Sequence, residues 1–385
     1  MTRDRRLELS RRHVLAAVGG VGAAAAGAGV GTSAYFSDSE EVTGNRLVAG
    51  ELDLMVDWAE HYSDWSVDEN DDRVSEGVFD GDPDENDTDT DGDGVDDFDV
   101  VTTDGDPAAI PSGYVGIPTP TEPLVAVPAE SLDDFQANTA TEAYPDADGD
   151  GRQDPILSRD QIATANPGFD PEEIEAAYRD QFAQVPDDLE APVIALDDVK
   201  PGDFGEVTFS LHLFDTPGYL WLTGGLVDAS ENGVTEPEAD DPDEADGVVE
   251  LLDEVRAAVW HDDGDNVLEA EEVVSSPHAV DQPSNVTLTA EEARITSGTL
   301  REVLAELSSG NGIPLDADSR SEPRDCYPNS TTRHVAFAWW LPVDHANEVQ
   351  TDSVTFDLGF YTEQCRHNDG GGLEPEATAT ETTPE

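Results

Sequence analysis

The pattern that most constrains the fold is an alternation of apolar and polar residues in the second half of the chain. It occurs in "EVTFSLHLFD" (206–215), "HVAFAWWLP" (334–342) and "SVTFDLGFYTEQC" (353–365). Successive side chains of a β-strand point to opposite faces, so a period of two predicts strands with one apolar face. The apolar faces are Val207, Phe209, Leu211 and Leu213; Val335, Phe337, Trp339 and Leu341; and Val354, Phe356, Leu358 and Phe360.

Three more segments extend the strand pattern. Residues 52–58 alternate in the same way, and "GYLWLTGGLV" (218–227) follows a Pro-Gly turn. Strand signals are also present in "APVIALDDVKPGD" (191–203). Many strands separated by turn signals, with few helices, are typical of an all-β protein. The sequence therefore predicts an antiparallel β-sandwich.

A few short helices are expected beside these strands. Residues 170–184 begin with Asp170 as a candidate N-cap and Pro171 at the first helical position, where proline is well tolerated. A second candidate covers 247–256. In a third, 296–310, apolar residues recur on one helical face and a glycine stands near the end.

The apolar alternation disappears between 61 and 190. There the chain is dominated by Asp, Pro, Gly and Thr, as in "DGDPDENDTDTDGDGVDDFD" (80–99). This composition predicts a long acidic insertion rather than a second core. The predicted organisation is a sandwich formed by 35–60 and 191–368, the insertion between them, and a disordered tail at 369–385.

The charge of the chain excludes some partners. With 88 acidic and 18 basic residues the formal net charge is -70, and Lys200 is the only lysine. Such a chain repels the phosphates of nucleic acids and anionic membrane surfaces. Six tryptophans and the alternating segments argue against the alternative of a fully disordered acidic chain. We therefore expect a folded protein of a halophile, since high salt screens the self-repulsion.

The N-terminus is organised like an export signal. Five arginines precede a weakly apolar run at 14–30, and "SRRHVL" (10–15) resembles the twin-arginine (Tat) motif. The run is short and only mildly apolar, which favours cleavage over a permanent membrane span. Small residues place the predicted cut between Ala34 and Tyr35, so that 1–34 is a signal peptide and the mature protein is secreted.

Export also bears on the two cysteines, Cys326 and Cys365. An even pair in an oxidising compartment predicts a single disulfide. The alternative, a catalytic or metal-binding thiol, is disfavoured because the pair lacks CxxC spacing.

A motif directly follows the predicted signal. In "TGNRLVAGELDL" (43–54) its residues are Gly44, Asn45, Ala49, Gly50, Leu52, Asp53 and Leu54. This motif resembles the start of the TasA/camelysin family of exported proteins, which carry a SipW-type signal peptide. Downstream, "GYLWLTGG" (218–225) and "VWHDDGDNVLEAEE" (259–272) look like the haloarchaeal branch of that family, so the resemblance covers about 30–58 and 191–368.

The resemblance implies a jelly-roll-like sandwich, secretion, and a role in fibres of the cell surface or biofilm matrix. Some relatives are labelled metallopeptidases. A zincin would need HExxH, but the sequence contains neither that motif nor GxSxG, and its eight histidines share no ligand spacing. We therefore expect no enzymatic activity.

Repeated aspartates in the insertion indicate calcium. Ca²⁺ takes six to eight oxygens, and alternating aspartates before a glycine turn let one short loop wrap the ion. "DTDGDGVDDFD" (89–99) and "DADGDGRQD" (146–154) share this core but lack the glutamate that ends an EF-hand loop. The alternative is a solvated acidic loop. The candidate ligands are Asp89, Asp91, Asp93 and Asp97, and Asp146, Asp148, Asp150 and Asp154.

A third calcium candidate lies in "HDDGDNVLEAEE" (261–272). Asp263, Asp265 and Glu272 fall at the third, fifth and twelfth positions of an EF-hand loop. His261 stands at the first position, and an asparagine replaces the usual glycine. A β-turn with solvated acids is the alternative.

Two surface features complete the sequence-based predictions. Asn86, Asn285 and Asn329 begin N-x-S/T sequons, which predict glycosylation unless they occur by chance. One of the neighbours Trp339 and Trp340 is expected to face outward because strands alternate, with a carbohydrate platform as the rival interpretation.

Together these patterns favour a secreted, non-enzymatic surface or matrix protein. We expect it to associate with itself or with other matrix proteins, through the addition of a strand-like segment at 35–49 to a neighbour's sheet. The alternative is a monomeric, calcium-dependent adhesion or ligand-binding module in which the acidic insertion is the active part.

Overall fold

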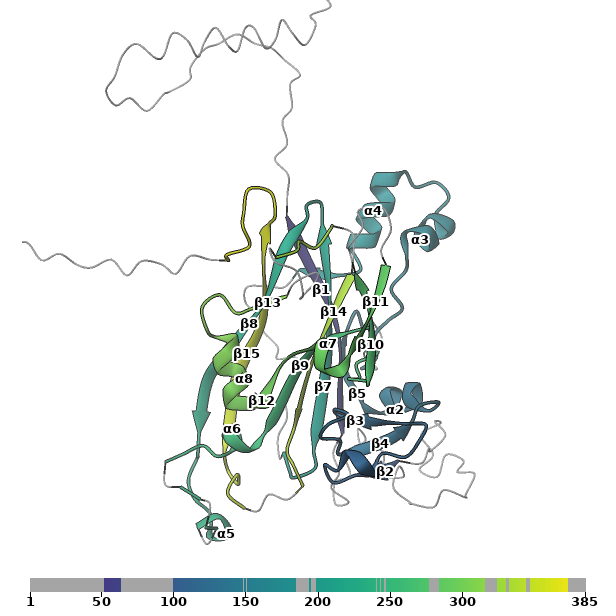
Figure 1. Ribbon diagram of the computed structural model, residues 1–385. Coiled ribbons are helices and arrows are strands. Elements are labelled where there is room, and N and C mark those ends of the chain that lie inside the picture. Colours follow the sequence, from purple (N-terminus) through teal and green to yellow (C-terminus); the bar gives the residue numbers. More distant parts are fainter. Residues whose placement is uncertain are drawn as a thin grey trace, which may run out of the picture. The chain divides into compact units, whose positions relative to one another are not determined.

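The computed structural model describes 52–63, 100–147, 149, 151–184, 194, 199–239, 241–242, 244–245, 247–276, 284–315, 324–329, 332–343 and 347–372 (Figure 1). Several sequence-based predictions lie outside these residues. They are the signal peptide with its cut at Ala34–Tyr35, the sequon at Asn86, the calcium ligands Asp89, Asp91, Asp93, Asp97, Asp148 and Asp150, and the tail beyond 372.

A large antiparallel sheet forms the centre of the fold (Figure 1). Its strand order is β12-β9-β14-β7-β1-β5, and the short β6 also pairs with β1. The longest pairing runs along all of β1, from Asp53 opposite Phe214 to Ser63 opposite Phe204. The strands are β1 (Asp53–Ser63), β5 (Ala140–Tyr144), β6 (Ala183–Gln184), β7 (Phe204–Phe214), β9 (Arg256–Asp262), β12 (Arg294–Thr299) and β14 (Thr332–Trp340).

A smaller sheet, of order β13-β8-β15, packs against this one. It consists of β13 (Ile313–Leu315), β8 (Gly218–Ser230) and β15 (Ser353–Gln364). The all-β antiparallel class is thereby confirmed, while the jelly-roll connectivity stays a prediction. Of the strand signal at 191–203, the described residues 194 and 199–203 belong to no strand, and the other seven lie outside the described residues.

The first core lies between the two sheets. The predicted apolar faces of β7 and β14 are buried in it, and the apolar face of β15 packs against it. Phe209 meets Phe360 edge to face at 5.3 Å between ring centroids, and Phe337 lies 5.9 Å from Phe356. Both contacts join the sheets, and the edge-to-face pair adds an attraction beyond the burial of apolar area.

Two short helices close this core. The helix α8 (Leu300–Leu307) buries Leu300, Val303, Leu304 and Leu307, and the Thr299–Glu302 capping box satisfies its first backbone N–H groups. The predicted range 296–310 was too long, because β12 occupies its start. Likewise α6 is confined to Leu251–Glu254, since the chain enters β9 at Arg256.

A second core covers the opposite face of the large sheet. Trp260 and Trp340 pack there with Phe135 and with the apolar residues of a small sheet of order β2-β4-β3. The elements on this side are β2 (Val101–Thr102), η2 (Pro107–Ala109), β3 (Tyr114–Ile117), β4 (Val125–Pro128), α2 (Leu132–Thr139), β10 (Glu271–Ser276), β11 (Ser284–Thr289) and α7 (Ala290–Ala293).

This arrangement corrects the prediction that Trp339 or Trp340 faces outward. Trp339 is 6% exposed in the first core, and Trp340 is 3% exposed in the second. The strand alternates as expected, but both of its faces are covered. The segment that the composition described as an acidic insertion supplies much of the second covering layer.

The remaining elements of that segment are two helices. In α4 (Pro171–Arg179), Asp170 caps the backbone N–H groups of Glu172 and Glu173, as the sequence predicts. The preceding α3 (Arg159–Ala165) is joined to it by the ion pair of Arg159 with Glu175 at 2.6 Å. A third short helix, α5 (Glu236–Ala239), follows β8. Among the described residues, no helix combines the length and apolarity needed to cross a membrane.

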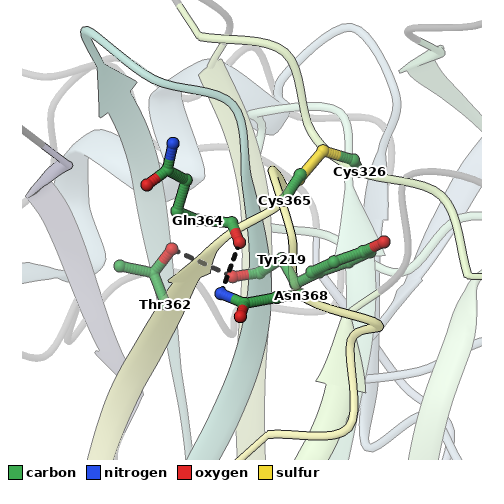
Figure 2. Close-up of a disulfide and its surroundings, with 6 residues drawn as sticks. All are labelled: Tyr219, Cys326, Thr362, Gln364, Cys365 and Asn368. Atoms are coloured by element: carbon green, nitrogen blue, oxygen red, sulfur yellow. Dashed lines mark hydrogen bonds between the residues drawn. A yellow bond between two sulfur atoms is a disulfide. The ribbon is translucent and has the colours of Figure 1, made fainter. Parts of the chain in front are cut away.

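The predicted disulfide is present between Cys326 and Cys365, whose Cα atoms are 6.1 Å apart. Figure 2 shows how it ties the segment before β14 to the end of β15. Beside it, the Thr362 hydroxyl donates to the Tyr219 carbonyl at 2.9 Å, and the Asn368 amide donates to the Gln364 carbonyl at 2.6 Å. The bridge therefore reinforces the end of the β8–β15 pair.

Candidate metal centre

A loop between β9 and β10 is wound around the carboxylate of Asp262, the last residue of β9. The indole N–H of the fully buried Trp260 donates to Oδ1 at 3.0 Å. The backbone N–H groups of Gly264 and Asn266 donate to Oδ2 at 2.8 and 3.2 Å. Asn266 adopts a φ of 60°, a left-handed conformation that asparagine tolerates better than most residues. The turn is therefore held closely against the sheet.

Five carboxylates converge on this loop. Ligand oxygens of Asp262, Asp263 and Asp265 all lie within 4.8 Å of one another. The same spacing holds for Asp263, Glu269 and Glu272, so Asp263 joins the two sets. The structure thus brings the predicted residues Asp263, Asp265 and Glu272 together. His261, which the EF-hand comparison placed at the first position, is in neither set, whereas its neighbour Asp262 is a member of the first set.

Glu272 is the most deeply placed of the five and is fully buried. Its Oε1 accepts the backbone N–H of Glu269 at 2.8 Å, whereas its Oε2 has no hydrogen-bond partner in the described part of the chain. A buried carboxylate oxygen without a partner is costly, so native structures usually supply a donor or a metal ion. A cation bound beside Glu272 would satisfy this oxygen.

Glu206 of β7, which β14 separates from β9 in the sheet, adds a sixth acidic group near the cluster. It is 5% exposed, and its Oε1 likewise has no partner among the described residues. Burial, followed by the charges of Asp262 and Asp265, raises its pKa well above the usual range. The sequence carries no local signal for this residue, because strand pairing alone brings it to the loop.

The electrostatics of the cluster match a site built for a cation. Burial is the main cause that raises the pKa of Asp262 to about 6, of Asp265 to about 7 and of Glu272 to about 9. Repulsion between the carboxylates adds to the shift in each case. A divalent cation would reverse this penalty, because it stabilises the ionised form of every ligand.

The donor set suits Ca²⁺. All five ligand candidates offer carboxylate oxygens, which hard cations prefer, and no cysteine or histidine takes part in either set. Both the large sheet and the layer outside it support the loop. Gln136 of α2 donates to the carbonyl oxygen of Asp265, and the Thr208 hydroxyl donates to the Asn266 side chain at 2.6 Å.

The second calcium candidate, at 146–154, looks different. Asp146 accepts the N–H groups of Gly149 and Gly151 at 2.7 and 3.0 Å, and Asp154 accepts that of Ala147 at 2.9 Å. These carboxylates stabilise the loop through its own backbone. Calcium binding here stays a prediction, because two of the four candidate ligands lie outside the described residues.

The other predicted site residues are dispersed. Asn329 lies in a half-buried turn before β14, and Asn285 lies in β11 opposite Ser275. Glycosylation of these sequons stays a prediction.

Comparison with known proteins does not place the chain in a family. No protein-family model matches it, and a search of curated proteins finds no match either.

Proposed function

We propose that this chain is an exported, non-enzymatic surface or matrix protein of a halophile, and that its subunits join by strand addition at an open sheet edge. The sequence supports export, a saline habitat and a likeness to the TasA/camelysin proteins. The observation that carries the proposal is β15, a twelve-residue strand that pairs with β8 and with no other described strand.

The edge of β15 offers what an added strand needs. Its backbone N–H and C=O groups on the side away from β8 have no strand partner among the described residues, so they can pair with another chain. The other edges of the two main sheets are shorter: β12 has six residues, β5 five and β13 three. Strand length sets the number of main-chain hydrogen bonds, which favours β15 as the acceptor.

Residues 35–49 are the proposed donor. They directly precede β1, and the predicted cleavage after Ala34 would turn them into a free end. Deletion of 35–49 should abolish filaments, seen by negative-stain microscopy, and leave a folded monomer. The matched control is deletion of 373–385, a segment of similar length at the other end. Unchanged filaments in the first variant would rule out the donor role.

A mixing experiment tests strand donation within filaments of the intact protein. A subunit that lacks 35–49 still offers the β15 edge but has no strand to donate. Added in small amounts to the intact mature protein, it should end growing filaments and shorten them in proportion to its fraction. Filaments of unaltered length would argue against strand donation. This holds even where the deletion variant by itself forms no filaments for another reason.

The carboxylate cluster favours a second candidate function, a calcium-dependent adhesion module that works as a monomer. The supporting observation is the group of acidic side chains already assembled around Asp263. Microscopy with Ca²⁺ and with a chelator separates the two functions. Filaments favour the matrix proposal, whereas discrete particles whose surface adhesion requires Ca²⁺ favour the module.

One buried constellation resembles a catalytic relay. His212 Nε2 lies 2.6 Å from Asp57 Oδ2, and the Thr332 hydroxyl lies 3.1 Å from His212 Nδ1. The His212 and Asp57 side chains are 7% and 1% exposed, and Phe182 stacks on the imidazole at 3.9 Å. A substrate cannot reach such a group, so we assign the constellation to stability. Cleavage of casein by the purified protein supplied with Zn²⁺ would contradict a non-enzymatic role.

A further inference from the structure

Five acidic residues from two distant parts of the chain lie near one another beside α6 and the start of β15. We propose that they form a second site for a divalent cation of the Ca²⁺ type, separate from the β9–β10 loop. The residues are Glu231, Glu238, Glu244, Glu250 and Asp352. No local pattern marks them, because Asp352 is 102 positions from Glu250 and the acidic stretch 231–250 resembles any other acidic loop of this chain.

Four of these carboxylates are anchored through one oxygen each. That oxygen accepts a backbone N–H group of the loop or helix beside it, which fixes the side chain and leaves its second oxygen for another ligand. The anchoring donors are Gly247 for Glu231 at 3.0 Å, Thr235 for Glu238 at 2.7 Å, Ala245 for Glu250 at 3.0 Å and Leu251 for Asp352 at 2.9 Å.

In every member of the group except Glu231, at least one carboxylate oxygen is buried and lacks a partner among the described residues. Glu238 Oε1, Glu250 Oε2, Asp352 Oδ1 and both carboxylate oxygens of Glu244 have no hydrogen-bond partner among the described residues. Glu238 is fully buried and Glu250 is 6% exposed. Several unpaired carboxylate oxygens in one covered place are rare in native proteins, because each carries a desolvation penalty that a bound cation would offset.

The charges in this place are unbalanced. Burial, followed by Glu250, Glu238 and Glu231, raises the pKa of Asp352 to about 6, and the same neighbours act on Glu244. Arg301 is near Glu250, but its guanidinium binds both oxygens of Asp253 at 2.7 and 2.8 Å. A divalent cation is the simplest counter-charge for the group.

The chemistry selects the class of ion. Carboxylate oxygens alone favour a hard cation, and side chains from loops and short helices suit Ca²⁺, which accepts irregular geometry more readily than Mg²⁺. No three of the five residues bring ligand oxygens within 4.8 Å of one another, in contrast to the first centre. Binding would therefore draw the free oxygens together.

The position indicates what the ion does. The Thr235 hydroxyl donates to Gln350 at 3.0 Å, and the Asn347 backbone N–H donates to Asp241 at 3.2 Å. These bonds already join the segment after β8 to the turn before β15. A cation held by Glu238, Glu250 and Asp352 would lock this junction and so fix the start of the β15 edge strand.

The test compares the mature wild-type protein with E238Q/E250Q in equilibrium dialysis against Ca²⁺ at high KCl. We expect the double variant to bind one Ca²⁺ fewer per chain. The matched control is D253N, which neutralises an acid of the same short helix whose carboxylate faces Arg301 instead of the cluster. It should keep the wild-type number. Equal binding by E238Q/E250Q and wild type would overturn the proposal.

Thermal unfolding shows whether the double variant folds. In chelator it should melt at or above the wild-type temperature, because two repelling charges are gone, whereas in Ca²⁺ it should melt below wild type. If it does not fold, E244Q takes its place, because Glu244 is half-buried and both its oxygens lack hydrogen bonds. In the same dialysis experiment, E244Q should lower the Ca²⁺ affinity of this second site by about tenfold or more. Unchanged affinity in E244Q would refute the site.

Discussion

At the scale of single residues, the chain places acids where water cannot reach them. Glu272 and Glu238 are fully buried, and Glu206 is 5% exposed. Each has one carboxylate oxygen without a hydrogen-bond partner in the described part of the chain. In a protein of net charge -70, such positions are the opposite of solvated surface acids. The buried acids, rather than the total charge, therefore mark the candidate sites.

The first prediction concerns Glu272 in the β9–β10 centre. E272Q removes a charged ligand, so Ca²⁺ affinity should fall by about tenfold or more. Tb³⁺ emission reports binding directly, because Trp260 donates to Asp262 and can sensitise an ion held in the loop. The exposed E291Q serves as the control. The assignment would be contradicted if E272Q and wild type reached half-maximal sensitised emission at the same Tb³⁺ concentration.

A second prediction concerns the pH dependence of stability in chelator. In the folded chain, Asp265 and Glu272 have pKa values of about 7 and 9. In the unfolded chain the same two carboxyl groups have their ordinary, lower pKa values and have already lost their protons at pH 7. Folding therefore binds protons, and stability should fall as pH rises from 7 to 9. His61 and His334, whose pKa values burial lowers to about 4, stay neutral in this window.

The measurement is the melting temperature between pH 7 and pH 9, with and without Ca²⁺. In chelator the wild-type value should decrease across this window, and E272Q should show a smaller decrease. Saturating Ca²⁺ should remove the dependence, because the ion takes the place of the protons. A melting temperature that rises with pH in chelator would show that the carboxylates are not buried as described.

At the scale of elements, β14 is the most informative strand. Its residues alternate between two cores, with Val335, Phe337 and Trp339 on one side and Ala336, Ala338 and Trp340 on the other. The alternation was readable in the sequence, but the covering of the second face was not. The small side chains Ala336 and Ala338 give the outer layer room to approach the sheet.

The third prediction follows from this covering. W340A should lower the free energy of unfolding by about 3 to 5 kcal/mol, the cost of deleting a buried aromatic side chain. Denaturant unfolding measures it. V227A, at a residue 57% exposed, is the control and should cost no more than about 0.5 kcal/mol. A similar small loss for W340A would mean that the outer layer does not pack on β14.

At the scale of the whole molecule, two links bind segments that lie far apart in the chain. Gln153 donates to Asp57 at 2.8 Å, and Asp57 contacts His212, so the acidic segment is tied to β1 and β7. The disulfide joins Cys326 and Cys365 across 39 positions. Both links help a strongly self-repelling chain to remain compact.

The fourth prediction concerns the disulfide. C326S/C365S should reduce the free energy of unfolding by about 4 kcal/mol, because an open loop of this length gains chain entropy in the unfolded state. Denaturant unfolding under oxidising conditions measures the loss. Reduced wild-type protein should match the variant. Equal stability of the variant and the oxidised wild type would show that the bridge does not constrain the unfolded chain.

Local patterns predicted the site only in part. Asp263, Asp265 and Glu272 are readable because the spacing of a calcium loop is local in sequence. Asp262 and Glu269 lie in the same loop, yet their part in the cluster depends on how the turn folds around Asp262. Glu206 and the cluster of Glu238, Glu250 and Asp352 left no sequence signal, since side chains far apart in the chain form them.

The sequence by itself determined the all-β class, the apolar faces of β1, β7, β14 and β15, the cap of α4 and the cysteine pair. These features depend on periodicity, on local hydrogen bonds or on a count of two cysteines, so neighbouring residues suffice to specify them. Only the tertiary structure decided that the acidic segment covers the second face of the large sheet and that carboxylates meet in buried clusters. Those outcomes depend on which surfaces pack together, and a one-dimensional pattern does not carry that information.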